Sequence, residues 1–202
     1  PVSRDELLLI VQQGLKKGEN NTSAAPKVML KKFVEGTSDT ARQLYNYVRL
    51  VAPTDMSVII EGESGTGKEN VAQTIHSLSP RSKAKFVAVD CGALSMELAA
   101  SELFGHVRGA FTGAVQDKIG QFEEAHKATL FLDEVGNLSY EIQIKLLRAI
   151  QERIIQPVGS NKEIKIDVRI LTATNDDLFE AVKRGNFRED LYHRINEFKL
   201  KV

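Results

Sequence analysis

The sequence predicts an α/β fold with three layers, α/β/α, around a mainly parallel sheet. Short apolar runs that are typical of buried strands alternate with amphipathic stretches of helical length. Such an alternation requires crossover connections, which place helices on both faces of a parallel sheet. The chain has 202 residues, 42% of them hydrophobic, which suits one domain of this kind with a small appendage.

The first predicted helix spans residues 38–51, because Leu44, Tyr47, Val48 and Val51 fall on one face. Continuous apolar runs such as MSVIIE are typical of strands that are buried on both sides. The remaining expected elements are strands at 56–61, 86–89, 130–132, 168–172 and 198–202, and helices near 68–78, 94–104, 139–152 and 177–184.

The N-terminal segment differs from the rest of the chain. Ser3 and Glu6 have the spacing of a helix capping box in front of an apolar stretch. Residues 18–26 (GENNTSAAP) have the composition of a linker. We therefore expect residues 1–26 to form a helix and a linker, and residues 27–202 to form the compact domain.

Composition limits the class of protein. The 27 basic and 27 acidic residues balance, which argues against a domain that binds nucleic acid on its own. Cys91 is the one cysteine, so an intramolecular disulfide is excluded and a cytoplasmic setting is favoured. No apolar run approaches the length of a membrane-spanning helix, so we expect no membrane partner.

A glycine-rich loop lies between the strand expected at 56–61 and the helix expected at 68–78. Its sequence is GESGTGKE, in which glycines permit a tight turn whose amides face an anion. Lys68 would neutralise the β- and γ-phosphates of a nucleotide. We therefore expect ATP, or a related nucleoside triphosphate, to bind at Gly62, Glu63, Ser64, Gly65, Thr66, Gly67, Lys68 and Glu69.

Two carboxylates follow the apolar strand at 130–132. Asp133 is expected to hold Mg²⁺, directly or through water, and Glu134 to orient and polarise the attacking water. Glu69 stands where Ser or Thr usually binds Mg²⁺, but its carboxylate is repelled by phosphate and is no simple replacement. The alternative for Asp133 and Glu134 is a solvated acidic turn.

Two further segments carry polar or glycine-rich signals. Asn175 follows the strand at 168–172, where its amide could sense the γ-phosphate; the alternative is a helix N-cap before Asp176. Gly109–Ala114 (GAFTGA) has the composition of a mobile loop with an exposed contact tip, the alternative being a glycine turn with Phe111 packed on the core.

GAFTGA and GESGTGKE resemble the signature loop and the phosphate loop of the AAA+ activators of sigma-54 RNA polymerase. The motifs ELFGH, TLFLDEVG, ATN and FREDLYHRI resemble the remaining motifs of that family, in the same order. The resemblance covers about residues 30–202. It implies a P-loop NTPase fold of the AAA+ type that hydrolyses ATP with Mg²⁺.

The resemblance also implies roles for particular residues. In the family, the GAFTGA loop contacts sigma-54, which corresponds here to Gly109, Ala110, Phe111, Thr112, Gly113 and Ala114. The arginines of FREDLYHRI, Arg188 and Arg194, would reach the ATP of a neighbouring subunit as arginine fingers, in a ring of six or seven. The alternative for each arginine is a surface ion pair with Glu189 or Asp190.

The sequence departs from the family at Asp90, at Lys127 and Ala128, which replace a common glycine pair, and at its C-terminal end. Members often carry Asn before the cysteine of the second strand, where it restrains the catalytic glutamate, but this chain has Asp90. Asp90 cannot donate an amide hydrogen bond, so a role at the catalytic site would need water. The family continues beyond the equivalent of Val202 into a helical lid, so we expect an AAA+ core that is truncated before the lid.

The functional expectation is an ATP-hydrolysing activator that remodels sigma-54 RNA polymerase and contacts DNA only through a domain absent from this sequence. Residues 1–17 resemble the last helix of a response-regulator receiver domain, which would place the protein in a two-component system. Three alternatives remain open: an AAA+ remodeller with a different client, a nucleotide-gated scaffold without turnover, and a sequence-specific DNA-binding module.

Overall fold

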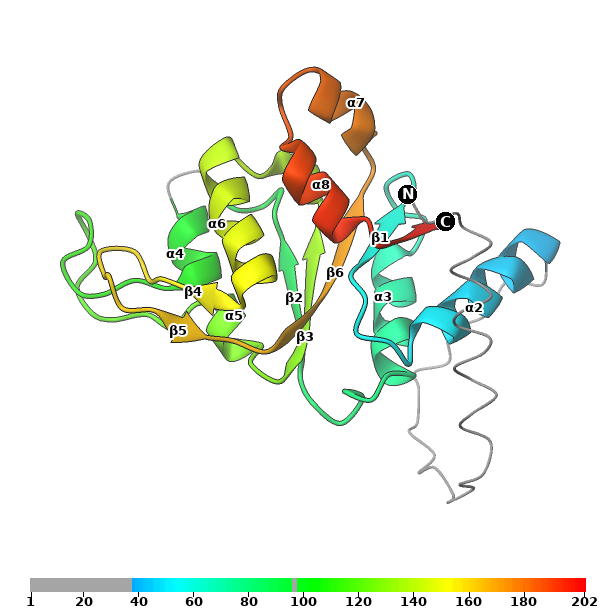
Figure 1. Ribbon diagram of the computed structural model, residues 1–202, viewed down its shortest axis with the longest axis horizontal. Coiled ribbons are helices and arrows are strands. Elements are labelled where there is room, and N and C mark those ends of the chain that lie inside the picture. Colours follow the sequence, from blue (N-terminus) through cyan, green and yellow to red (C-terminus); the bar gives the residue numbers. More distant parts are fainter. Residues whose placement is uncertain (1–37, 96–97) are drawn as a thin grey trace. The chain divides into compact units, whose positions relative to one another are not determined.

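A sheet of five parallel strands lies at the centre of the domain, in the order β2-β3-β6-β1-β7 (Figure 1). The computed structural model describes residues 38–95 and 98–202, so the expectations for residues 1–37 lie outside the described residues. The strands are β1 Val58–Glu61, β2 Phe86–Asp90, β3 Ala128–Asp133, β6 Val168–Thr174 and β7 Phe198–Lys201. The predicted fold class is confirmed.

Parallel pairing gives every strand of this sheet the same direction. Val58 pairs with Leu171 on one side and with Phe198 on the other. Asp90 pairs with Asp133 at the ends of β2 and β3. The carboxyl ends of the strands therefore meet at one edge of the sheet, which is where open α/β sheets bind ligands.

Helices cover the sheet on both faces. One face carries α2 (Asp39–Val51) and α3 (Lys68–Ser77), and its core is continuous with Val58 and Ile60 of β1. Ile59 points to the opposite face and belongs to the other core, to which the remaining helices contribute. These helices are α4 Ala99–Phe104, α5 Gln121–Glu124, α6 Tyr140–Glu152, α7 Leu178–Lys183 and α8 Glu189–Ile195.

The C-terminal end of α2 is fixed by a buried arginine. Arg169 of β6 is 1% exposed, and its guanidinium donates to the carbonyl oxygens of Ala52 at 2.6 Å and Val51 at 3.0 Å. These carbonyls lie at the negative end of the α2 dipole, which stabilises the cation. Burial lowers the pKa of Arg169 to about 10, so the side chain stays charged at neutral pH.

Some elements differ from the sequence prediction. The helix expected at 94–104 begins only at Ala99, because Gly92–Leu94 form a bend that leads away from β2. Short elements carry too few residues to show a period, and five of these had no prediction: α5, α8, the 3₁₀ helix η1 (Val135–Asn137), and the two strands of a hairpin, β4 (Ile154–Ile155) and β5 (Ile164–Lys165). Across the described part of the chain, no helix is both long and apolar enough to cross a membrane.

Candidate active site

The predicted nucleotide residues gather at the carboxyl edge of the sheet. The Gly62 amide, just after β1, donates to Thr174 O at the end of β6 at 3.2 Å. The Cys91 amide, just after β2, donates to Asp133 O at the end of β3 at 3.0 Å. Backbone hydrogen bonds thus join the end of β1 to that of β6 and the end of β2 to that of β3.

The glycine-rich loop has the backbone that an anion cradle needs. Gly65 and Gly67 have φ values of 79° and 89°, a left-handed region that favours glycine. At Gly62, a Cβ atom would lie 2.9 Å from the carbonyl oxygen of Val202, so a side chain would collide with the residue that follows β7. The Thr66 amide donates to Glu63 O at 3.3 Å and closes the turn.

Lys68 begins α3 and lies beneath the loop. Its side chain is only 7% exposed, and Nζ donates to Gly62 O at 2.9 Å and Glu63 O at 3.0 Å. The amides of the first turn of a helix have no intrahelical acceptor and point toward the same place. A cation and free amides at the start of a ten-residue helix therefore fit a triphosphate.

Glu69 points away from this cradle. Its Oε1 accepts a hydrogen bond from Gln73 Nε2, one turn along α3, at 3.0 Å. The side chain is exposed, and this orientation agrees with the expectation that it does not replace the usual Ser or Thr at Mg²⁺.

Asp133 has one carboxylate oxygen available for a metal ion. Its Oδ1 accepts the Glu134 amide at 2.9 Å, and no protein group in the described residues binds Oδ2. No group of three His, Cys, Asp or Glu residues in this part of the chain forms a metal cage. A site with one carboxylate fits Mg²⁺ bound mainly by phosphate and water, as is usual at nucleotide sites.

Glu134 takes an unusual conformation at the end of β3. Its φ and ψ are 51° and 44°, in the left-handed region, and it caps η1. Its Oε2 accepts a hydrogen bond from Asn137 Nδ2 at 3.0 Å. Sequence reasoning missed Asn137, because this contact depends on the left-handed backbone of Glu134, which the sequence does not show.

Asp90 and Cys91 flank Glu134 on the β2 side. Asp90 Oδ1 accepts the amides of Gly92 at 2.9 Å and Ala93 at 3.3 Å, so this carboxylate stabilises a turn. Burial, with smaller contributions from the neighbouring carboxylates, raises the pKa of Cys91 to about 12. The buried thiol of Cys91 therefore stays protonated at neutral pH.

Asn175 is exposed directly after β6, the strand that lies between β3 and β1. The alternative that it caps the next helix is wrong. The cap of α7 is Asp177, whose Oδ1 accepts the amides of Phe179 at 3.0 Å and Glu180 at 3.1 Å. The Asn175 amide is thus left at the edge of the sheet.

The two arginines of the last helix lie in different surroundings. Arg188 precedes α8 and forms a bidentate pair with Asp190, with Nε at 3.0 Å and Nη2 at 2.7 Å. This pair raises the pKa of Arg188 and lowers that of Asp190. Arg194 is 3.9 Å from Glu197, and about half of its side chain is exposed. The ion-pair alternative describes Arg188 with Asp190, whereas Arg194 is the more accessible cation.

The loop Gly109–Ala114 lies outside the sheet, between α4 and α5. Gly109 and Gly113 have φ values of 80° and 101°, and the Gly109 amide donates to Ala114 O at 2.8 Å. Thr112 is exposed, while Phe111 is 36% exposed with its ring edge-on to His106 at 5.0 Å. Phe111 therefore rests on the loop's own base, and it does not enter either hydrophobic core.

The hairpin β4–β5 packs against this loop. Gly159, in the hairpin turn, has φ 78°, and a Cβ there would lie 2.6 Å from Ala110 Cβ. Figure 1 shows the hairpin and the loop segment side by side, and His106 forms a bridge to Val158. Two segments far apart in the sequence therefore form one extension.

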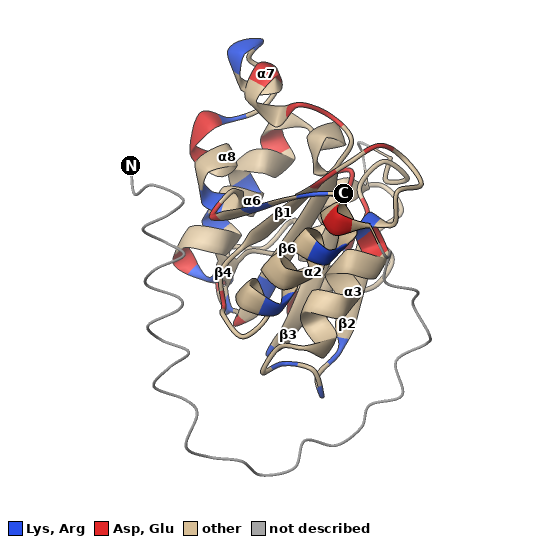
Figure 2. Cartoon of the chain, turned by 90° about the vertical axis from the view of Figure 1, so that its right-hand side faces the viewer, with Lys and Arg blue, Asp and Glu red and all other residues tan. Residues whose placement is uncertain are grey.

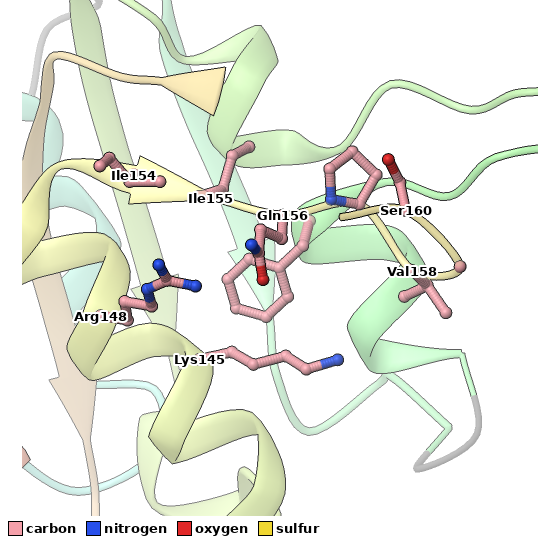
Figure 3. A pocket seen from close by; sticks show the side chains of 10 residues that line it. Lys145, Arg148, Ile154, Ile155, Gln156, Val158 and Ser160 are labelled. Carbon is pink, nitrogen blue, oxygen red and sulfur yellow. The ribbon is translucent and has the colours of Figure 1, made fainter. Parts of the chain in front are cut away.

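A cavity of about 200 Å³ lies between this hairpin and α6 (Figure 3). Its charged lining residues are Lys145 and Arg148, but Arg148 already pairs with Glu152 and Glu163. The cavity is thus a poor anion site and is separate from the loop after β1.

Basic and acidic residues are interspersed along the helices seen in Figure 2, in keeping with the balanced composition.

A family model described as the sigma-54 interaction domain matches residues 34–201. This chain belongs to that family. Transcriptional regulatory protein GlrR of Escherichia coli K12 is 47% identical to this chain over 202 residues, which cover all of this chain and 45% of the regulator. The chain therefore spans less than half of the length of that relative.

Solved structures agree with the family and the fold. NtrX from Brucella abortus, crystallised in complex with ATP, has a TM-score of 0.78 and 34% identity; the match covers all of this domain and 43% of NtrX. A P-loop NTPase domain of a sigma-54 activator from E. coli has a TM-score of 0.57 at 20% identity, covering 82% of this chain and 96% of that domain. The latter similarity supports the P-loop NTPase fold.

Proposed function

We propose that this sigma-54 interaction domain hydrolyses ATP at the carboxyl edge of its sheet and uses the energy to remodel sigma-54 RNA polymerase, in the cytoplasm. The observation that carries the proposal is that Lys68, after β1, and the pair Asp133 and Glu134, at the end of β3, lie at the same carboxyl edge of one parallel sheet. NtrX, a structural neighbour, was crystallised in complex with ATP, which supports nucleotide binding by this chain.

Each residue has a task in this scheme. Lys68 and the amides of the Gly62–Glu69 loop hold the phosphates, and Asn175 senses the γ-phosphate from the end of β6. Asp133 holds Mg²⁺, which would neutralise charge on the phosphate oxygens. Glu134 polarises the attacking water once its carboxylate turns toward the nucleotide.

Arginine fingers complete the site from a neighbouring subunit. Arg194 is the better candidate, because its guanidinium is exposed and its contact with Glu197 is long, at 3.9 Å. Arg188 would first have to leave its bidentate pair with Asp190. A site completed in trans requires self-association, and the proposed assembly is a ring of six or seven subunits.

The loop Gly109–Ala114 is the proposed contact with sigma-54. Thr112 is exposed at its tip, and glycines with positive φ on either side allow the loop to change conformation. An AAA+ remodeller with a different protein client would use the same nucleotide site, so only a polymerase assay separates these two functions. Contact with DNA is proposed only for segments beyond this domain.

The test measures ATP hydrolysis per subunit over a range of protein concentrations, in the wild type and in Glu134→Gln. We expect the wild-type rate to rise with concentration as subunits assemble, and the variant to lose at least about a hundredfold in kcat. A flat wild-type rate contradicts fingers in trans. Hydrolysis that is unchanged in Glu134→Gln contradicts the assigned catalytic residue, and no hydrolysis at all favours a scaffold.

A further inference from the structure

The side chain of Glu134 is turned away from the phosphate loop. A Cβ added to Gly92 would lie 2.2 Å from Glu134 Oε2, so the carboxylate occupies the space above this glycine. Gly92 follows β2, which borders β3 on one side. The loop that contains Lys68 follows β1, which lies beyond β6 on the other side of β3. In this orientation Glu134 faces the wrong strand for water activation.

One amide holds the carboxylate in that place. Asn137 Nδ2 donates to Glu134 Oε2 at 3.0 Å, and the Asn137 backbone amide donates to Glu134 O at 3.0 Å. The η1 turn thus joins the two residues through both backbone and side chain. A hydrogen bond from a neutral amide to an ionised carboxylate is stronger than a hydrogen bond between two neutral groups.

Asp90 cannot supply this hydrogen bond. Its Oδ1 lies 3.2 Å from the same Gly92 Cβ position, and Asn137 Nδ2 lies 3.1 Å from it. The three side chains therefore converge above Gly92, two as carboxylates and one as an amide. Two carboxylates repel each other, so the only side-chain donor of the three is Asn137.

We propose that Asn137 is a positioning residue that restrains Glu134 in its turned-away orientation, and that ATP hydrolysis requires this hydrogen bond to break. The proposal rests on the proposed function, since it takes Glu134 as the group that polarises water. In this proposal Asn137 donates the hydrogen bond that restrains Glu134, because the carboxylate of Asp90 cannot donate one. Removing the restraint therefore speeds turnover without changing nucleotide affinity.

The experiment measures kcat at saturating ATP, and the Kd of ATP, for Asn137→Ala. The protein concentration is the one that gives the highest rate per subunit. We expect kcat to rise about threefold to tenfold, the factor that a net hydrogen bond of ordinary strength provides, while Kd stays within twofold. Asn161→Ala, an exposed asparagine of the hairpin, serves as the matched control and should leave kcat unchanged.

A second variant tests for rescue. Asp90→Asn keeps the Oδ1 atom that accepts the Gly92 and Ala93 amides, and it adds a donor beside Glu134. In the Asn137→Ala background it should return kcat to within twofold of the wild type. A structural role for Asn137 predicts no such rescue, because the new donor does not restore the contacts of the lost side chain.

The outcomes separate this inference from the function on which it rests. Turnover that depends on Glu134, combined with an unchanged or lower kcat in Asn137→Ala, overturns the restraint alone. Raised turnover that Asp90→Asn fails to lower also overturns it. Turnover that is insensitive to Glu134→Gln overturns the proposed function first, and the restraint with it.

Discussion

The carboxyl edge of the sheet and the Gly109–Ala114 extension are built by different means. At the edge, parallel registers fix each strand end, and Lys68 is buried beneath a loop that it bonds twice. Directly after the loop of the extension, Val115 and Ile119 are 78% and 66% exposed. The difference teaches that strand ends fix the residues of the proposed nucleotide site, whereas two glycines with positive φ shape the loop Gly109–Ala114.

The largest expected effect is a loss of ATP affinity at the carboxyl edge of the sheet, with the extension unchanged. Lys68→Ala removes the buried cation that faces the phosphates, and the Kd of ATP should rise about a hundredfold, equivalent to about 3 kcal/mol. Isothermal titration calorimetry measures the change. Lys85→Ala, which removes an exposed cation paired with Glu124, should leave Kd unaltered. Equal affinity of Lys68→Ala and the wild type rules out the phosphate-loop assignment.

A smaller effect is expected from a substitution that disturbs the extension and leaves the carboxyl edge of the sheet unchanged. Gly159→Ala places a Cβ against Ala110 and also strains a backbone with φ 78°. The hairpin and the loop must then separate, so polymerase activation should fall about tenfold, roughly 1.4 kcal/mol, while ATP turnover stays within twofold. Amide hydrogen exchange in 109–114 should become faster.

Gly185→Ala is the matched control for that substitution. Gly185 has nearly the same φ, 75°, but nothing lies within 4 Å of its added Cβ. It should carry the backbone cost of about 1–2 kcal/mol without disturbing the loop. If both variants lose polymerase activation equally, strain explains the result and the contact between Gly159 and Ala110 does not.

The smallest effect lies at the opposite edge of the sheet. Asp167 precedes β6 and pairs with Arg81 at 2.7 Å, and this hydrogen bond lowers the pKa of Asp167. A lowered folded pKa adds stability that is present above the unfolded value, near 4, and is lost as pH falls through the folded value. Because Asp167 is largely exposed, the contribution is below about 1 kcal/mol.

Urea unfolding of Asp167→Asn measures this contribution. The variant should be slightly less stable than the wild type at pH 7, and the gap should close below pH 4. ATP affinity and polymerase activation should both stay unchanged, because the substitution touches neither region. A difference in the free energy of unfolding that grows below pH 4 would contradict a lowered pKa of Asp167 in the folded protein.

Much of the edge could be predicted from the sequence. The apolar runs before Gly62 and Asp133 are long enough to identify strands, and residues at strand ends necessarily share one edge of a parallel sheet. The phosphate loop, the acidic pair and Asn175 therefore lie where expected. The helix-cap alternative for Asn175 failed because Asp177 has the same capping chemistry two residues later.

The extension and the surroundings of Glu134 could not be predicted in the same way. β4 and β5 are two residues each and are held by tertiary contacts, so they leave no periodic signal. The orientation of Glu134 depends on its left-handed backbone and on Asn137, three residues later in a turn. Conformations of single residues are set by packing that composition does not reveal.

The central claim is that ATP turnover at the edge acts on polymerase through the extension. Its most direct test measures promoter opening by sigma-54 RNA polymerase and ATP hydrolysis in the same reaction, for the wild type and Thr112→Ala. We predict that the variant keeps its hydrolysis rate within twofold and loses at least tenfold in promoter opening. Full promoter opening by Thr112→Ala at an equal hydrolysis rate would contradict the account.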